Sequence, residues 1–403
     1  WSNAGQSTPP DHDVNYNTLG SVWGTAFQRS SKKLFASAFL KRHTSLGPDG
    51  LGAIYQIDYS NGGVPTVSTL VDLKAAPFNL NLGIFDESDA SRFLSPTTPV
   101  SEDPEAFGKV GKVGFGNLTI SDDESTLYTI NLFEKKLIKI QIGLPAATPT
   151  LGDVVEFVLP TPNCNLGTSR PFAVTFYKGL VYIGMVCSAE NGGTVNDMFA
   201  HIYTFDPSTS TFALLPGFPV PLNYTKGASH YNNNTMVAYG TAWNPWSDIA
   251  TEHHDFSTGI VIRHPTPVLS DIDFSAGGDF MVLGFMDRAS HQWGYGNRRP
   301  DGESGLYLYF SGGDILMAHN NTGTWQLESN GAVGSLTGCG SNNNQGPGGG
   351  EFLCNDRWEG DHLEIAVGGN IVNVARNSVK AALYDPITYD TGGTSDWSLH
   401  LGD

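Results

Sequence analysis

The sequence predicts an all-β fold, a β-propeller built from four-stranded blades, and three observations support this prediction. Short apolar stretches pair into the same hairpin pattern five times along the chain, with turn-forming residues between the two strands. Glycine accounts for 48 of 403 residues, roughly 12% against an average near 7%, and no segment shows sustained helical periodicity. A hairpin repeated around an axis cannot bury its faces alone, and radial stacking of blades is the common solution.

The five hairpins are assigned in chain order from their β-branched and aromatic residues. Their strands are expected at 22–27 and 34–40, 117–120 and 126–130, 172–176 and 180–186, 269–274 and 280–285, and 363–367 and 371–375. In the last hairpin, the turn is assigned to Gly368 and Gly369.

A second pair of strands follows each hairpin and completes the four strands of a propeller blade. These strands are expected at 53–58 and 66–72, 137–142 and 154–159, 200–205 and 211–215, 314–318 and 324–328, and 381–384 and 397–401. Five blades can be traced, and a sixth would lie within 75–115 or 216–268. No linker interrupts the pattern, so we expect one propeller domain over residues 1–403.

The long connections are all expected on one face of the propeller. If the strands of a blade are labelled A to D from the axis outward, antiparallel order puts the A–B and C–D turns on one face, the turn face. The B–C and D–A connections then share the opposite face, the loop face. The long segments are all of this second kind, at 41–52, 75–115, 187–199, 216–268, 286–312 and 329–361. Long loops in compact domains are usually functional, so the loop face is the expected binding surface.

The charge balance excludes some classes of partner. Asp and Glu number 40 against 22 Lys and Arg, a formal net charge of −18, which opposes binding to nucleic acid and to anionic lipid. Cations are therefore favoured over phosphates as partners. No apolar run reaches the roughly 18 residues that span a bilayer, so no membrane insertion is expected. Because no signal-peptide pattern follows Trp1, we interpret the numbering as starting at a mature, processed end.

The cysteines predict two disulfides and an extracellular or cell-surface location. They form two sequence-local pairs, Cys164 with Cys187 and Cys339 with Cys354, and none has the spacing of a zinc site. The alternative is four reduced thiols in a cytosolic protein. Glycosylation sequons occur about as often as chance predicts, at Asn117, Asn223, Asn233 and Asn320.

Polar residues close each B strand and are expected to meet near the axis on the loop face. They are Lys41, Arg42, His43, Asn131, Glu190, Asn191, Asp287, Arg288, His291, Arg376 and Asn377. Mixed charges converging on a channel mouth are typical of a ligand site. The strongest ligand-binding candidates are Arg42, His43, Glu190, Asp287, Arg288 and His291. The alternative is a ring of salt bridges between blades that neutralises buried charge.

A pair of carboxylates suggests a calcium ion in the channel. Asp271 and Asp273 lie two residues apart on a predicted innermost strand, so their side chains share one side. Oxygen ligands suit Ca²⁺, although no EF-hand loop is present. Alternatively, Asp271 caps a strand turn.

Three further features lie in the predicted loops. Trp243 and Trp246 flank a turn, where exposed indoles would stack on sugar rings or a protein partner, or else cap the channel. The acidic and histidine run 252–255 is interpreted as a solvated loop in preference to a metal site. The glycine-rich run 342–352 is either a binding loop or a tight structural crossing.

Several short phrases add up to a family resemblance. They are Val22-Trp23-Gly24, Phe39-Leu40-Lys41-Arg42-His43, Leu46-Gly47-Pro48, Gly52-Ala53-Ile54-Tyr55, the run 269–274, the run 284–288, and Gly346-Pro347-Gly348-Gly349-Gly350-Glu351-Phe352. Together they resemble a propeller-type module found near the start of large secreted or surface proteins that continue into SdrD-like or collagen-adhesin B-type repeats. The likeness extends over most of the chain and implies architecture and location, with no activity to carry over. Cys339 and Cys354 around the glycine-rich phrase depart from the pattern, and the absence of a repeat suggests a segment of a longer protein.

Two functions of different classes follow from these expectations. The first is an extracellular adhesion or assembly module that binds a glycan or a protein through its loop face, as a building block of a surface filament. The second is a propeller hydrolase or lyase with its site at the channel mouth. A pKa-perturbed acid or a metal in the channel would favour the enzyme, and exposed apolar groups on the loop face would favour the binding module.

Overall fold

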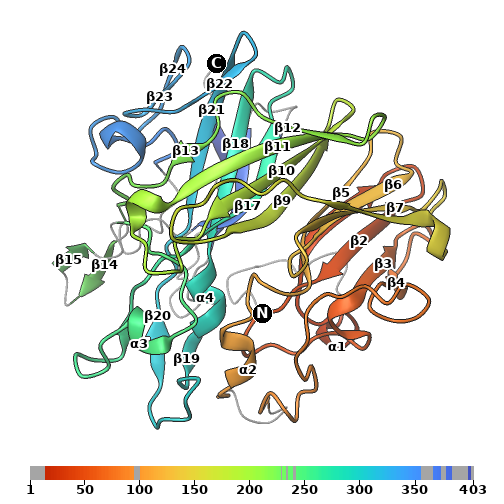
Figure 1. Cartoon of the computed structure of the whole chain (residues 1–403), viewed down its shortest axis with the longest axis horizontal. Coiled ribbons are helices and arrows are strands. Elements are labelled where there is room, and N and C mark those ends of the chain that lie inside the picture. The colour runs from red at the N-terminus through yellow and green to blue at the C-terminus, as the bar shows by residue number, and fades with distance from the viewer. Residues whose placement is uncertain are drawn as a thin grey trace.

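The computed structural model describes residues 14–94, 100–227, 229–232, 235–238, 242–354, 366–373, 378–383 and 398–400. These residues form an all-β propeller of antiparallel sheets, coloured in chain order in Figure 1. Four sheets each contain a four-stranded antiparallel blade, and a fifth sheet contributes three described strands.

The first four blades confirm the strands expected from the sequence. Blade 1 contains β1 (Val22–Gln28), β2 (Lys33–Ala38), β3 (Ala53–Asp58) and β4 (Thr66–Asp72). Blade 2 contains β5 (Phe115–Ile120), β6 (Thr126–Asn131), β7 (Lys136–Gln141) and β8 (Val154–Val158). Blade 3 contains β9 (Ser169–Tyr177), β10 (Leu180–Cys187), β11 (Phe199–Asp206) and β12 (Thr211–Leu214), and β13 (Val220–Pro221) also pairs with β11. Blade 4 contains β17 (Pro267–Phe274), β18 (Phe280–Asp287), β21 (Asp314–Asn321) and β22 (Thr324–Leu327).

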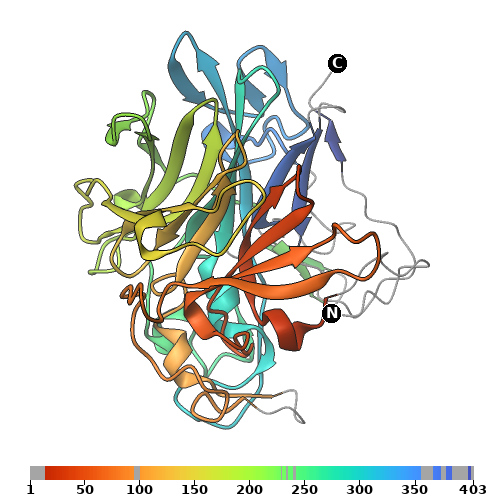
Figure 2. The same ribbon diagram turned by 90° about the vertical axis from the view of Figure 1, so that its right-hand side faces the viewer.

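The innermost strands follow one another around the axis in chain order. β1 packs on β5, β5 on β9, β9 on β17, and β17 on β25 (Ala366–Asn373). Glycines make this close approach possible, since a Cβ on Gly24 would lie 2.4 Å from the amide nitrogen of Leu118. The same holds for Gly116, whose Cβ would lie 2.4 Å from the carbonyl oxygen of Phe172. Residues of β1 and β25, the first and last of these strands, line the same cavity on the axis, and Figure 2 shows the dark blue fifth sheet and red blade 1 from the side.

The fifth sheet corrects the sequence prediction. Its strands are β25, β26 (Ser378–Leu383) and β27 (Ser398–His400), so the expected hairpin at 363–367 and 371–375 is wrong. Gly368 and Gly369 lie inside β25, where the pairing register shifts, and not in a turn. Gly368 has φ +82°, and a Cβ there would lie 2.2 Å from Ser270 Oγ of blade 4. The glycine therefore serves a bulge at which two blades touch.

Shorter elements occupy the connections. The helices are α1 (Tyr16–Leu19), α2 (Pro104–Phe107), α3 (Ala250–His253) and α4 (Arg288–Trp293), with 3₁₀ turns at Gly50–Gly52, Leu151–Asp153, Val195–Asp197 and Pro347–Gly349. The additional strands are β14 (Ser229–Asn232), β15 (Thr235–Ala238), β16 (Val261–Ile262), β19 (Tyr295–Asn297), β20 (Tyr307–Tyr309), β23 (Ala332–Val333) and β24 (Leu336–Thr337). Within the described residues, neither 75–115 nor 216–268 forms a sixth four-stranded blade.

The helical connections gather at one end of the molecule. α2, α3, α4, β19 and β20 lie together at the lower end of Figure 1 and define the loop face. The last insertion differs, because its β23–β24 hairpin lies beside β22 at the upper end. Its Val333, Phe352 and Leu353 pack into one apolar cluster with residues of blades 4 and 5. This insertion therefore braces the junction between two blades.

Both predicted disulfides are confirmed. Cys164 bonds to Cys187 and ties the segment before β9 to the end of β10, while Cys339 bonds to Cys354 within the last insertion. Each is worth on the order of 2–4 kcal/mol in a model where the crosslink restricts the unfolded chain. The bonds indicate an oxidising environment. Among the described helices, none has the length and hydrophobicity that crossing a membrane requires.

Candidate functional site

Arg42 lies at the centre of the loop face as a structural hub. Its side chain is only 1% exposed, and its Nε donates to Asp103 O at 3.0 Å. Its Nη1 donates to Gln292 O at 2.8 Å, and its Nη2 to Arg298 O at 2.8 Å and to Glu102 O. Burial lowers the pKa of Arg42 to about 9. Arg42 therefore joins three separate connections, and the prediction that it contacts a ligand is wrong because no surface of it is free.

Arg288 performs the same role for another set of connections. Its Nε donates to Val110 O at 2.8 Å, and its Nη1 donates to Ser247 O at 2.8 Å. Its Nη2 bonds to Asp248 Oδ1 at 2.7 Å, and its guanidinium lies over the Trp246 ring, 4.6 Å from the centroid. Arg288 is fully buried, so it is also not an exposed ligand contact.

The two tryptophans are core residues and not exposed stacking platforms. Trp243 is 1% exposed and Trp246 is 2% exposed, which contradicts the prediction of a sugar-binding surface. The indole of Trp246 donates to Pro267 O at 2.8 Å, and that of Trp243 donates to Tyr224 Oη at 3.0 Å. They cap the interior beneath the loops, as the alternative interpretation proposed.

The two predicted acids of the loop face also bond to residues of the chain itself. Asp287 is buried and accepts bonds from the amides of Thr266, Ala289 and Gly312 and from the Tyr309 hydroxyl. Burial raises the pKa of Asp287 to about 6 despite these donors. Glu190 bonds to Lys112 at 2.8 Å and to Arg170. Burial opposes its ionisation, yet Arg170 and Lys112 keep the pKa of Glu190 lowered.

The two predicted histidines are neutral packing groups. The Nδ1 of His43 lies 2.6 Å from Ser101 Oγ, and burial together with the charge of Arg42 lowers its pKa to about 2. His291 packs edge-on against Trp23 and Phe39, and neither of its ring nitrogens has a hydrogen-bond partner. Burial and Lys41 lower its pKa to about 3. The loop-face polar residues thus form bonds between connections, close to the alternative of a structural ring.

The remaining loop-face predictions have mixed outcomes. Asn131 bonds to Asn81 O at 3.2 Å, whereas Arg376 and Asn377 lie outside the described residues. In the run 252–255, His253 is buried and stacks on His264, although its neighbours Glu252 and Asp255 are exposed as expected for a solvated loop.

A cavity of about 840 Å³ lies on the propeller axis. Residues of all five innermost strands line it: Val22, Trp23, Thr25, Ala26, Asn117, Leu118, Thr119, Ile120, Val174, Thr175, Phe176, Asp271, Ile272, Asp273, Gly369 and Asn370. Most of those from β5, β9 and β17 come from the strand halves next to the A–B turns. At the opposite end of the cavity, near the start of β1, Trp23 packs against Phe39 and Phe172. The cavity therefore opens on the turn face, opposite the mouth that the sequence led us to expect.

Asp271 and Asp273 stand together on one wall of this cavity. Asp271 accepts bonds from the side chain of Asn117 at 3.0 Å and from the amides of Ile272 and Asn370. Asp273 accepts bonds from the amides of Phe274 and Val372. Burial raises the pKa of Asp271 to about 7 and also raises that of Asp273. The two acids thus fasten β17 to β25 through neutral donors.

The calcium hypothesis stays a prediction. In the part of the chain that the structure describes, no three His, Cys, Asp or Glu side chains lie close enough to hold a metal ion. Any ion at Asp271 and Asp273 would need main-chain or water oxygens for most of its six to eight ligands.

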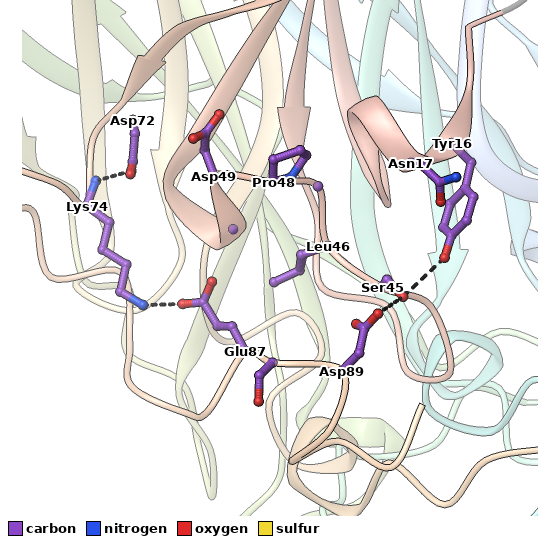
Figure 3. Close-up of a pocket in the computed structure, with 13 residues that line it drawn as sticks. Tyr16, Asn17, Ser45, Leu46, Pro48, Asp49, Asp72, Lys74, Glu87 and Asp89 are labelled. Atoms are coloured by element: carbon purple, nitrogen blue, oxygen red, sulfur yellow. Dashed lines mark hydrogen bonds and ion pairs between the residues drawn. The ribbon is translucent and has the colours of Figure 1, made fainter. Parts of the chain in front are cut away.

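A second cavity, of about 660 Å³, lies at the rim of blade 1 and was not predicted (Figure 3). Its carboxylates are Asp49, Asp72, Glu87 and Asp89. Glu87 pairs with Lys74 and accepts from the Leu51 amide at 2.7 Å, and Asp89 accepts from Ser45 Oγ at 2.9 Å. The cavity is assembled from four separated segments between residues 16 and 89, so no local pattern marks it.

The sequons remain predictions. Asn223 is exposed and Asn320 is half-buried, whereas the amide of Asn117 is engaged with Asp271 inside the axial cavity. Asn233 lies outside the described residues.

Comparisons with known proteins identify related sequences. No protein-family model matches the chain. Colossin-A of Dictyostelium discoideum is 30% identical over 85% of this chain, and colossin-B of the same organism is 26% identical over 96%. Among solved structures, hydrazine synthase of Kuenenia stuttgartiensis aligns with 94% of this chain and 76% of its own at 11% identity, with a TM-score of 0.33. The chain is thus similar to one segment of the colossins, and it spans 3% of colossin-A and 9% of colossin-B.

Proposed function

We propose that the chain is an extracellular adhesion or assembly module whose loop face binds a glycan or a protein partner. The observation that supports this most directly is the pair of buried arginines that fasten the connections to one another. Arg42 joins three connections, and Arg288 joins its own connection to two more.

Such bonding makes the loop face a prebuilt surface. Main-chain carbonyls accept most of the bonds from both guanidinium groups, so the paths of the connections are fixed, not only their side chains. A surface that is ordered before binding loses little conformational freedom when a partner docks. Long connections held in this way are typical of recognition scaffolds.

The loop face also presents large apolar side chains to solvent. They are Ile84, Phe93, Phe133, Leu166, Ile249, Ile260, Tyr295 and Leu306. Exposed apolar groups on an ordered surface favour the binding of another surface. The two disulfides suit an extracellular location, and the resemblance to modules of large surface proteins suggests use as a building block of a filament.

A propeller hydrolase or lyase is the second candidate, and one observation favours it. Asp271 lies in the axial cavity with a pKa near neutrality, as general acids often do. Its two carboxylate oxygens, however, already accept three bonds from donors on β5, β17 and β25. We therefore rank the enzyme below the binding module.

A matched pair of triple variants tests the loop face. The first replaces Ile84, Ile249 and Leu306 by Ser, and the control replaces Val64, Leu144 and Leu151 by Ser, which are exposed in C–D turns on the turn face. Self-association is measured by sedimentation velocity, and glycan binding on an array of defined oligosaccharides. We expect the first variant to lose binding at least tenfold and the control to match the wild type.

Equal loss in both variants, or no self-association and no glycan binding by the wild type, would contradict the proposal. An enzyme would instead show turnover that Asp271→Asn abolishes and that the loop-face variant retains.

A further inference from the structure

We propose that the axial cavity binds a primary alkylammonium group, of the kind carried by a lysine side chain. This site is on the turn face and is independent of the loop-face function. Its main elements are the carboxylates of Asp271 and Asp273, the indole of Trp23 and an apolar wall.

The first argument concerns charge. Among the described residues, the cavity lining contains two carboxylates and no Lys, Arg or His side chain. In the described residues no salt bridge reaches Asp271 or Asp273, and the five donors that contact them are neutral amides. Both side chains are half-buried, and carboxylates partly shielded from water are commonly paired with a cation or a metal. The described part of the chain thus supplies no positive partner for this pair, and we assign that role to a bound ligand.

The second argument concerns the shape of the occupant. Val22, Ile120, Val174 and Phe176 line the same cavity and would pack against a methylene chain. Trp23 also lines it, and an indole face attracts an ammonium group. A small hard cation would make no use of these groups. An aliphatic stem with a charged end would contact both the apolar wall and the acids.

The third argument concerns an unsatisfied polar group. Both amide atoms of Asn370, which lines the cavity, are buried and lack a hydrogen-bond partner. Buried side-chain amides rarely stay unpaired. An ammonium group has three donors, enough for a carboxylate and a neighbouring carbonyl oxygen. The unpaired oxygen of Asn370 lies against β18, where a Cβ on Gly284 would be 2.3 Å from it, so it becomes an acceptor for the ammonium group only when the side chain rotates toward the cavity.

Calorimetry with Nα-acetyl-lysine-N-methylamide tests the proposal on the whole chain. We expect binding at pH 8 that is at least tenfold weaker for the Nε-acetylated analogue, which keeps the stem but lacks the charge. If only the alkylammonium group is recognised, butylammonium should bind as tightly as the lysine derivative. Tighter binding of the lysine derivative would identify a peptide as the source of the amine. No binding of either amine at millimolar concentration, or equal binding of the acetylated analogue, would overturn the proposal.

Variants locate the site. Asp273→Asn should weaken amine binding at least tenfold, and the exposed loop-face change Leu306→Ser should leave it unchanged. If Asp273→Asn fails to fold, the wild type still decides, because binding should weaken as pH falls from 8 to 5 and should take place with proton release near pH 7. Binding without any pH dependence, or displacement of the amine by calcium chloride together with a calcium-dependent rise in Tm, would contradict the assignment and favour the calcium site.

Discussion

The loop face and the axial cavity use similar residue types and reach opposite electrostatic states. At the loop face, the charged side chains bond to other residues of the chain and are not available to a ligand. This holds for Arg42, Arg288 and Glu190. In the axial cavity, the donors to Asp271 and Asp273 within the described residues are all neutral. The contrast teaches that a convergence of charged residues signals a binding site only where the opposite charge is missing.

The largest expected loss of stability concerns Arg42 at the loop face, where the charge is paired within the chain. Arg42→Met leaves the carbonyls of Asp103, Gln292 and Arg298 without their buried donor. We expect a loss of about 3–5 kcal/mol in the free energy of unfolding, measured by urea denaturation. The matched control is Arg298→Met, whose exposed side chain pairs with Glu102 and should matter by less than about 1 kcal/mol. Equal effects of the two changes would show that Arg42 is not a hub.

The next effect concerns pH and the buried histidines. The unfolded His291 takes up a proton below its ordinary pKa of 6.5, whereas the folded side chain resists protonation until about pH 3. Its contribution to stability is therefore present above pH 6.5 and is lost as the pH falls toward 3. His291→Phe should reduce the stability difference between pH 7 and pH 4 by roughly 2–4 kcal/mol. An unchanged difference in denaturation curves at the two pH values would contradict this.

In the axial cavity, Asp271 is expected to make a smaller contribution to the pH dependence of stability, with the opposite sign. Unfolded Asp271 loses its proton above 3.8, whereas the folded carboxyl keeps it until about pH 7. Its contribution is therefore present below pH 3.8 and is lost as the pH rises to 7. Asp271→Asn should remove roughly 1–3 kcal/mol of this pH dependence, less than a fully buried group because the side chain borders the cavity. A variant with the same slope as the wild type between pH 4 and pH 7 would show that Asp271 is ionised throughout.

The smallest expected loss of stability concerns one of the neutral donors to Asp271. Asn117→Ala deletes one neutral bond to Asp271 and should cost about 1 kcal/mol at pH 8, measured by thermal unfolding. Thr25→Ala, at a cavity position on β1, is the control for lost packing. A much larger loss in Asn117→Ala than in the control would mean that this amide holds blades 2 and 4 together.

The fold was predictable where the signals are local. The strands at 53–58 and 66–72 match β3 and β4, and both disulfides join sequence neighbours. Blade 5 was misassigned because a glycine bulge at a contact between blades has the same residues as a turn. The role of Arg42 could not be predicted, because its carbonyl acceptors at Asp103, Gln292 and Arg298 lie 61, 250 and 256 residues away. Any residue type supplies a main-chain carbonyl, so the sequence contains no mark of such a partner.

The carboxylates of Asp271 and Asp273 join blade 4 to a strand that the ribosome makes about a hundred residues later. Blades 1 to 4 are local meanders, and each can form as soon as its own strands have emerged. The wall of the axial cavity exists only when β25 has docked and presented its amides. A chain that lacks this last blade would leave each of the two acids without its amide donor from β25, so the last blade to be made completes the bonding of these side chains.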